Sequence, residues 1–200
     1  MTLLALVRHG QTDWNAERRI QGRTDIPLND TGRAQALIAA DALRDGSWTH
    51  IASSPLQRAR ETAEIIAEAL GLEAPSTHAG LVERDYGVGE GTLVSDFLER
   101  FGTGPVPGGE SAEHLAERAL QALGAVADDA PGEATIVVAH GGVIRALLGI
   151  ATDGALPRPG ERIENASVTV FRLTEEGLAL ESASLDTPVL TPSDREASGA

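Results

Sequence analysis

Short apolar runs alternate along the chain with longer stretches in which apolar residues recur every three or four positions. Two of the runs, residues 3–7 (LLALV) and 134–139 (ATIVVA), are continuous and are followed by polar residues, which predicts strands buried on both faces. Further strands are predicted at residues 50–53, 73–77, 165–173 and 178–183.

The first predicted helix follows a polar loop that spans residues 9–28. Three candidate N-cap residues, Asn29, Asp30 and Thr31, precede its apolar pattern over residues 32–43. We expect the buried face of this helix to consist of Ala34, Leu37, Ile38 and Ala42.

Later helices carry clearer start and stop signals. Ser54 is the expected N-cap of the second helix, with Pro55 in its first turn, and Gly71 ends it. Ser111 begins a long helix that runs to about Asp129. Shorter helices are predicted at residues 93–101 and 143–150.

Strands that alternate with helices define the expected fold class. We predict an α/β three-layer sandwich with a mostly parallel central sheet and helices on both faces. Residues 1–186 are expected to form a single domain, and residues 187–200, which contain Pro, Ser and Asp, a disordered tail. Ligands of such sheets bind beyond the carboxyl ends of the strands, so we expect the functional site there.

The last predicted strands are relevant to whether two copies of the chain associate. Val168, Val170 and Phe171 are expected on an edge strand, whose unpaired backbone groups are available to a second chain. The sequence therefore allows a homodimer but leaves the oligomeric state open.

Charge excludes several classes of partner. The formal net charge of −14 argues against nucleic acid or an anionic membrane, because both require clustered positive charge on the protein. All 16 basic residues are arginine, so a few local guanidinium groups would have to hold an anionic substrate. A general bias in composition explains the absence of lysine equally well.

The remaining composition excludes several chemistries. The chain has no cysteine, which excludes thiol nucleophiles and cysteine-ligated metals. The five histidines show no metal-ligand spacing, and we expect no metal and no other cofactor. The apolar start of the chain lacks the pattern of a signal peptide, and no run reaches membrane-spanning length, so we expect a cytoplasmic enzyme.

Two segments of the chain resemble one another: LALVRHG at residues 4–10 and TIVVAHG at residues 135–141. Each places a histidine, His9 or His140, at the end of a predicted buried strand. A single histidine there is more often structural, but neighbouring parallel strands would bring both imidazoles to the same edge of the sheet. A neutral imidazole can accept a phosphoryl group when donors surround the phosphate oxygens, and Arg8 lies beside His9.

Further motifs extend this pattern over most of the chain. Residues 6–15 read LVRHGQTDWN, in which the RHG triplet precedes a Gln and a later Asn. The other motifs are QGRTDIPLNDTGRAQA at 21–36, SSPLQRARETA at 53–63, ERDYGVGEG at 83–91, PGGES at 107–111 and VVAHGG at 137–142. In content and order they resemble the histidine phosphatase superfamily, which includes the phosphoglycerate mutases and acid phosphatases, and the resemblance implies the phosphoglycerate mutase-like fold.

The resemblance also implies a role for individual residues. His9 would be the nucleophile that becomes phosphorylated, and Glu83 would be the proton donor. Without the resemblance, Glu83 would be taken for a surface carboxylate and Arg58 for an exposed helical charge. The residues implied to bind the phosphate are Arg8, Asn15, Gln21, Arg58, His140 and Gly141.

Three functions remain open at this point. We favour a phosphomonoesterase that hydrolyses a small phosphorylated metabolite, because residues 92–109 are short and carry one basic residue, Arg100. Mutases of the superfamily use a longer, more basic insertion there, although Arg84 and Tyr86 also match the mutases. The alternatives are a cofactor-dependent phosphoglycerate mutase and an inactive module that binds a phosphorylated ligand. Gly89 departs from the phosphatases, which commonly carry an aromatic residue in that segment.

Overall fold

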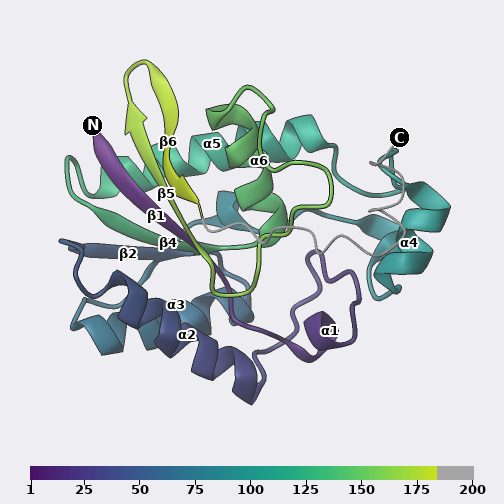
Figure 1. Cartoon of the computed structure of the whole chain (residues 1–200), viewed down its shortest axis with the longest axis horizontal. Coiled ribbons are helices and arrows are strands. Elements are labelled where there is room, and N and C mark those ends of the chain that lie inside the picture. The colour runs from purple at the N-terminus through teal and green to yellow at the C-terminus, as the bar shows by residue number, and fades with distance from the viewer. Residues whose placement is uncertain (184–200) are drawn as a thin grey trace, which may run out of the picture.

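A computed structural model describes residues 1–183, and the predicted tail at residues 187–200 lies outside the described part of the chain. Within residues 1–183, one sheet runs in the order β3-β2-β4-β1-β5-β6 (Figure 1). The first four strands in that order are mutually parallel, whereas β5 pairs antiparallel with β1, and β6 pairs antiparallel with β5. The strands are β1 (Thr2–Arg8), β2 (His50–Ser53), β3 (Ser76–Thr77), β4 (Thr135–Ala139), β5 (Val168–Thr174) and β6 (Gly177–Ala183).

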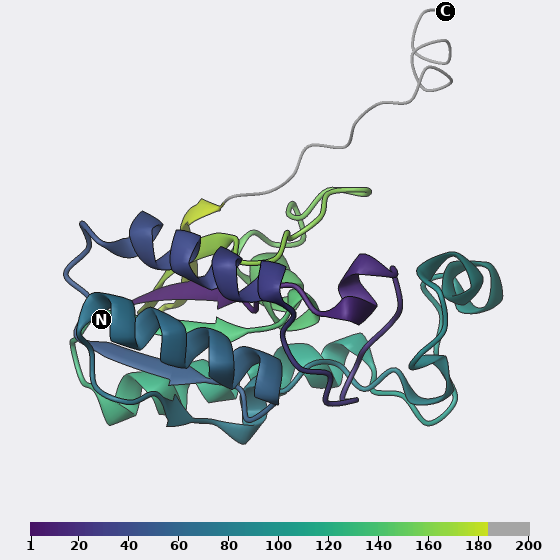
Figure 2. The ribbon, with the colours of Figure 1, turned by 90° about the horizontal axis from the view of Figure 1, so that it is seen from below.

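Helices cover both faces of this sheet and complete three layers (Figures 1 and 2). Helices α2 and α3 bury Ile66 against Ile136 and its neighbours, while α5 and α6 bury Leu147 with Leu6 and Phe171 on the opposite face. The helices are α1 (Asp13–Ala16), α2 (Asp30–Leu43), α3 (Gln57–Leu70), α4 (Val94–Phe101), α5 (Ala112–Asp129) and α6 (Gly141–Ala151), with short 3₁₀ turns at Ala79–Leu81 and Gly87–Gly89. The predicted fold class is therefore confirmed.

Two local predictions are wrong in extent. The expected loop at residues 9–28 contains α1, which begins at a capping box: Thr12 and Asn15 each accept a hydrogen bond from the other's backbone N–H. The predicted strand at residues 73–77 shortens to Ser76–Thr77, because only these residues pair with β2. Neither difference changes the order of the layers.

The buried face of α2 is the reverse of the prediction. Ala36, Ala39 and Ala40 are buried, whereas Leu37 and Ile38 are 54% and 67% exposed. Apolar residues surround nearly the whole helix, so the periodicity alone does not select a face. The alanine face lets α2 pack closely on α3, which presents its own alanines to it.

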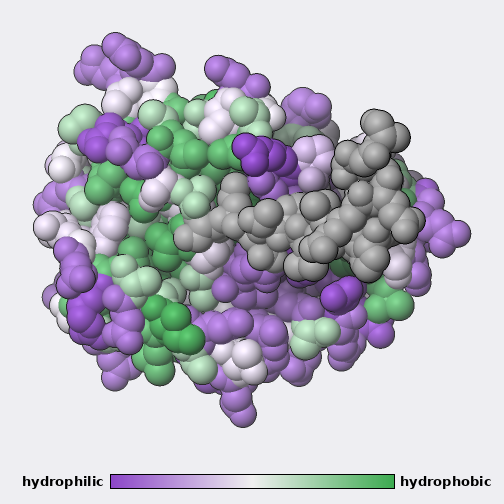
Figure 3. Space-filling view, in the orientation of Figure 1, coloured by the Kyte–Doolittle hydropathy of each residue, from purple (hydrophilic) through white to green (hydrophobic). Residues whose placement is uncertain are grey.

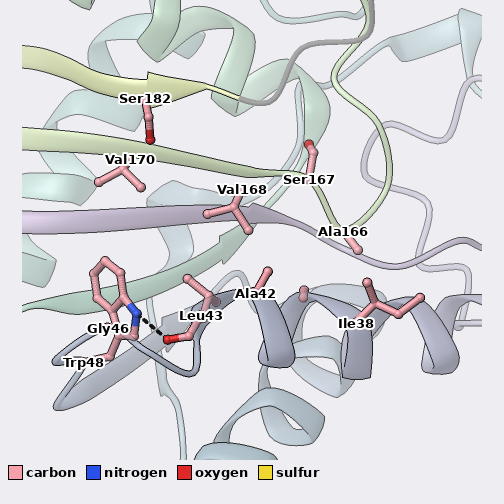
Figure 4. Close-up of a pocket in the computed structure, with 11 residues that line it drawn as sticks. Ile38, Ala42, Leu43, Gly46, Trp48, Ala166, Ser167, Val168, Val170 and Ser182 are labelled. Atoms are coloured by element: carbon pink, nitrogen blue, oxygen red, sulfur yellow. Dashed lines mark hydrogen bonds between the residues drawn. The ribbon is translucent and has the colours of Figure 1, made fainter.

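The exposed side of α2 borders a groove of about 410 Å³ between this helix and β5 (Figure 4). Ile38, Trp48, Val168 and Val170 line it, and apolar side chains gather on this side of the molecule (Figure 3). The prediction of an edge strand at Val168–Phe171 is wrong, because β5 pairs with both β1 and β6 and Phe171 lies in the core. The homodimer stays a prediction.

Candidate active site

The two strand-end histidines lie side by side. Strands β1 and β4 are parallel neighbours, and Arg8 is in register with Ala139, so His9 and His140 follow at the same level. Their ring centroids are 5.2 Å apart. The predicted meeting of the two imidazoles at the carboxyl edge of the sheet is therefore confirmed, and the loops with α1 and α4 extend beyond this edge (Figures 1 and 2).

His9 is held in a defined orientation. Its Nδ1 lies 2.7 Å from the carbonyl oxygen of Gly10, which assigns the ring proton to Nδ1 and leaves a lone pair on Nε2. Burial, with the positive charges of Arg58 and Arg8, holds the pKa of His9 well below its usual range. The imidazole is thus neutral at physiological pH, as a nucleophile must be.

Gly10 allows the tight approach that positions this ring. A Cβ atom at Gly10 would lie 2.3 Å from the carbonyl oxygen of Gly32, at the start of α2. The backbone N–H of Gly10 donates to the hydroxyl of Thr62 on α3. The loop after β1 is therefore pressed between two helices, and a side chain at this position would displace it.

His140 is buried completely and is held differently. Its Nε2 lies 2.8 Å from Ser54 Oγ, while its Nδ1 has no hydrogen-bond partner among the described residues. Burial lowers the pKa of His140 well below its usual range, and Arg58 and His9 lower it further. The expectation that Ser54 caps α3 is wrong: the N-cap is Leu56, without a side-chain cap, and the Ser54 hydroxyl both accepts the Leu56 N–H at 3.3 Å and contacts His140.

Arg58 is entirely buried in the first turn of α3, so its interpretation as an exposed helical charge is wrong. Its Nε donates to Nε2 of His9 at 3.3 Å, and its two terminal nitrogens donate to the carbonyl oxygens of Gly22 and Thr24. Burial lowers the pKa of Arg58 to about 10, so the guanidinium remains charged at neutral pH. The two carbonyl groups fix the plane of the guanidinium against His9.

Arg8 leaves part of its guanidinium unused. Its Nη1 donates to the carbonyl oxygen of Ile163 at 2.6 Å, while Nε is buried without a partner among the described residues. Gly141 opens α6 close by, since a Cβ atom there would lie 3.5 Å from Arg8 Nε. The N–H groups in the first turn of a helix have no acceptor within the helix, so this position suits an anion.

Asn165, which no sequence pattern indicated, connects Asn15 to the backbone of His9. Asn165 donates from one amide nitrogen to the carbonyl oxygen of His9 at 2.9 Å and to Oδ1 of Asn15 at 3.3 Å. Asn165 follows no motif and precedes a strand, so no local signal marks it. Gln21 is nearly buried next to Gly22, and its Oε1 has no partner in the described part of the chain.

Glu83 faces the start of α6. Its Oε2 accepts the backbone N–H of Gly142 at 3.0 Å, and its Oε1 accepts the backbone N–H of Arg84 at 2.7 Å. Only 9% of Glu83 is exposed, so its interpretation as a surface carboxylate is wrong. The carboxylate is thus held at Gly142, the residue that follows His140 and Gly141 in the chain.

Glu90 connects the segment of residues 83–91 to the loop of residues 22–24, whose carbonyl oxygens accept hydrogen bonds from Arg58. Its carboxylate accepts hydrogen bonds from the backbone N–H groups of Arg23, Thr24 and Tyr86, and from the hydroxyl of Thr24. The motif around Glu90 was evident in the sequence, but its role required the three-dimensional contacts.

Phe97 of α4 packs against Gly89, the residue that departs from the expected aromatic pattern of this segment. A Cβ atom at Gly89 would lie 2.5 Å from the Phe97 ring, and Phe97 meets Tyr86 edge to face at 5.5 Å. An aromatic residue from another element therefore supports Tyr86. The local packing is complete despite the glycine.

Within residues 1–183, no group of three or more His, Asp or Glu side chains is arranged to hold a metal ion. No helix in the same range has the length and apolar character needed to cross a bilayer.

Fold and site together define an α/β protein in which a neutral, oriented imidazole lies against a buried guanidinium group and a second buried imidazole. The chain belongs to the histidine phosphatase superfamily (branch 1), whose family model matches residues 4–186.

The chain resembles relatives that are named phosphatases and relatives that are named phosphoglycerate mutases. It is 40% identical over 176 residues to the uncharacterized phosphatase PhoE of Bacillus subtilis (strain 168), covering 88% of this chain and 91% of the relative. It is 37% identical over 213 residues to the probable phosphoglycerate mutase GpmB of Salmonella choleraesuis (strain SC-B67), covering 95% and 98%. The structure of a mycobacterial glucosyl-3-phosphoglycerate phosphatase superposes with a TM-score of 0.78 at 29% identity, covering 91% and 99%.

Proposed function

We propose that this protein is a phosphomonoesterase that hydrolyses a small phosphorylated metabolite through a phosphohistidine on Nε2 of His9. The observation that supports this most directly is the hydrogen bond of His9 Nδ1 to Gly10, which leaves the Nε2 lone pair facing Arg58. The similarity to a phosphatase at 40% identity points the same way.

The first step transfers the phosphoryl group to the enzyme. The Nε2 lone pair of His9 forms the new N–P bond as the P–O bond to the alcohol breaks, and the carboxyl proton of Glu83 passes to the departing oxygen. Arg8, Arg58 and His140 bind the nonbridging oxygens, where negative charge is concentrated in the transition state. Glu83 then remains as a carboxylate.

The second step releases phosphate. The Glu83 carboxylate takes a proton from a water molecule, whose oxygen attacks phosphorus as the N–P bond breaks. The electron pair of that bond returns to Nε2 of His9, and the resting state is restored. Glu83 ends this step protonated and ready for the next ester.

Water is preferred over a second phosphorylated acceptor because of the charge around α4. A mutase has to retain a doubly phosphorylated intermediate, whereas Val94–Phe101 contains Asp96 and Glu99 beside a single arginine, Arg100. Arg100 lies over the ring of Phe101 at 4.9 Å. This segment therefore adds little to the binding of a second phosphate.

A substrate panel with a nucleophile variant tests the proposal. Wild-type protein should release phosphate from several monoesters and should not isomerise 3-phosphoglycerate in the presence of a bisphosphoglycerate primer. His9→Ala should lower the turnover of p-nitrophenyl phosphate by at least about 10⁴-fold, because the nucleophile is removed. His50→Ala, at the exposed start of β2, is the matched control and should retain full turnover. Efficient isomerisation, or turnover in His9→Ala close to the wild-type rate, would contradict the proposal.

Two further expectations accompany this function. Neither step uses a metal ion, so treatment with EDTA should leave phosphate release unchanged. Activity that is lost to EDTA and restored by a divalent cation would show that the metal-free scheme is wrong. The cytoplasmic location stays a prediction.

A further inference from the structure

The PGGES motif at residues 107–111 has no part in the chemistry described so far, and its glutamate belongs to a buried ion pair. Glu110 lies just before α5, and its side chain is 3% exposed. Its two carboxylate oxygens accept hydrogen bonds from Nε and Nη2 of Arg118, in the second turn of α5, at 2.6 and 2.7 Å. This bidentate contact fixes the plane of the Arg118 guanidinium.

Arg118 uses the rest of its guanidinium on the backbone that carries Glu83. Its Nη1 donates to the carbonyl oxygens of Gly80 and Val82 at 2.8 and 2.7 Å, and its Nη2 donates to that of Glu83 at 3.0 Å. With the two bonds to Glu110, all five N–H groups of the side chain have an acceptor. Three of these five bonds hold a single stretch of four residues.

This stretch of backbone has little regular structure of its own. Residues 82–86 belong to no helix or strand. Gly80 allows a close approach to α5, since a Cβ atom there would lie 2.8 Å from the Cβ of Ala122. Glu110 adds a further connection, because its backbone N–H donates to the carbonyl oxygen of Asp85 at 2.9 Å. The course of this backbone is therefore set by its contacts to α5 and to the motif that precedes it.

The carboxylate of Glu83 has little freedom beyond that of its backbone. It accepts the backbone N–H groups of Arg84 and Gly142, as described above. A Cβ atom at Gly142 would lie 2.2 Å from Oε1 of Glu83, so the carboxylate lies directly against the backbone of α6. A shift of the backbone that Arg118 holds would therefore move the carboxylate out of these contacts.

We propose that Arg118, oriented by Glu110, is a positioning residue for the proton donor Glu83. It holds the backbone of residues 80–83 at the place from which the carboxyl proton of Glu83 reaches the departing alcohol oxygen. The inference rests on the proposed phosphomonoesterase function, because that function makes Glu83 the acid. Arg118 does not touch the substrate and acts only through Glu83. A displacement of about 1 Å from a productive geometry can slow a reaction about 10²-fold, so an indirect effect of this kind is measurable.

Two esters that differ in their need for a proton test the proposal. Phenyl phosphate and p-nitrophenyl phosphate share a ring, but phenolate is a much stronger base than p-nitrophenolate and leaves poorly without a proton. Arg118→Gln should lower kcat/KM for phenyl phosphate by about tenfold or more and for p-nitrophenyl phosphate by about threefold or less. The ratio kcat/KM includes the steps up to release of the phenol, so the later attack of water does not enter it. A general loosening of the site would lower both values alike.

A double-mutant cycle shows whether the effect passes through Glu83. In a Glu83→Gln background the proton is already absent, so adding Arg118→Gln should change kcat/KM for phenyl phosphate by about twofold or less. A residue that only supports the fold would cause the same loss in both backgrounds.

A conservative variant separates the geometry of Arg118 from its charge. Arg118→Lys keeps a positive charge beside Glu110, and is expected to fold even where Arg118→Gln does not, but it lacks the planar fork and two of the five N–H groups. It should show the same selective loss on phenyl phosphate. The matched control is Arg172→Gln, which removes an arginine from the ion pair with Glu181 on β6 and should leave both esters unchanged.

The outcomes separate this inference from the function on which it rests. Equal losses on the two esters, an additive loss in the Glu83→Gln background, or full activity in Arg118→Lys overturns the positioning role and leaves the phosphomonoesterase intact. If neither Arg118 variant folds, the ion pair supports the fold as a whole and the assignment to Glu83 is overturned. Failure of the wild-type protein to hydrolyse either ester overturns the phosphomonoesterase, and the positioning role falls with it.

Discussion

The ends of β1 and β4 have nearly the same sequence, yet they hold their histidines in opposite ways. His9 has its Nδ1 against a backbone carbonyl and its Nε2 toward Arg58, whereas His140 has its Nε2 against the hydroxyl of Ser54 and its Nδ1 without a partner. A carbonyl can only accept, so it fixes the tautomer of His9; a hydroxyl can donate or accept, so it leaves that of His140 adjustable. This difference supports the proposed roles, with the nucleophile at the end of β1 and phosphate binding at the end of β4.

The largest effect in this comparison is expected at Glu83, which the β4 end holds through Gly142. Glu83→Gln cannot supply a proton to a poor leaving group, so turnover of an alkyl phosphate should fall by about 10³-fold. Turnover of p-nitrophenyl phosphate, whose leaving group needs no proton, should fall by about tenfold or less. Glu133→Gln, an exposed residue at the opposite edge of the sheet, is the control. Equal losses on both esters would show that Glu83 is not the proton donor.

A smaller loss is expected when the histidine on β4 is changed. His140→Asn removes one contact to the phosphoryl oxygens and should lower kcat by about 10²-fold, in the range found for a single lost transition-state donor. The phosphoenzyme should still form in this variant, only more slowly, as followed by rapid-quench labelling. If His140→Asn abolished labelling while His9→Ala retained it, the two assignments would have to be exchanged.

Both regions bury a neutral imidazole, and this should appear in the pH dependence of stability. The pKa of each histidine is lowered in the folded state, so below about pH 6.5 the unfolded state binds more protons and stability falls as the pH falls. Replacing either histidine with asparagine should lower the slope of the unfolding free energy against pH, by at most about 1.4 kcal/mol per pH unit, below pH 6. Urea unfolding at several pH values measures this slope, and an unchanged slope in both variants would contradict neutral burial.

The smallest effect concerns the hydroxyl that holds His140. Ser54→Ala removes the hydroxyl contact to His140 and the longer hydrogen bond from the Leu56 N–H, and should lower kcat/KM by about fivefold. The neighbouring Ser53 offers a matched control, because its hydroxyl is equally buried and has no hydrogen-bond partner within residues 1–183. Ser53→Ala should therefore leave kcat/KM unchanged. Similar losses in both variants would indicate that packing at the end of β2, and not the contact to His140, is responsible.

Much of this arrangement could be predicted because it depends on repeated local patterns. Continuous apolar runs identified β1 and β4, and the histidines at their ends met as parallel pairing requires. The face of α2 could not be predicted, because alanines and larger apolar residues occupy opposite sides and only the proximity of α3 decides between them. Sequence periodicity records which residues are apolar, but not how closely two helices approach.

The rest of the site escaped prediction because it is built from contacts that are distant in sequence. Ser54 resembled a helix cap until β2 placed its hydroxyl against His140, 86 positions away. Asn165 reaches His9 across 156 positions and lies outside every motif. Arg58 resembled a surface charge because its acceptors are backbone carbonyls, whose direction no sequence pattern specifies.

The most direct test of the central claim is to identify the atom that is phosphorylated. Protein quenched in alkali during turnover of a ³²P-labelled monoester should carry label on His9 through Nε2, and the label should be lost on treatment with acid. Peptide mapping locates the residue, and NMR spectroscopy of the phosphoprotein distinguishes Nε2 from Nδ1. Label on His140, linkage through Nδ1, or an adduct that survives acid would contradict the account.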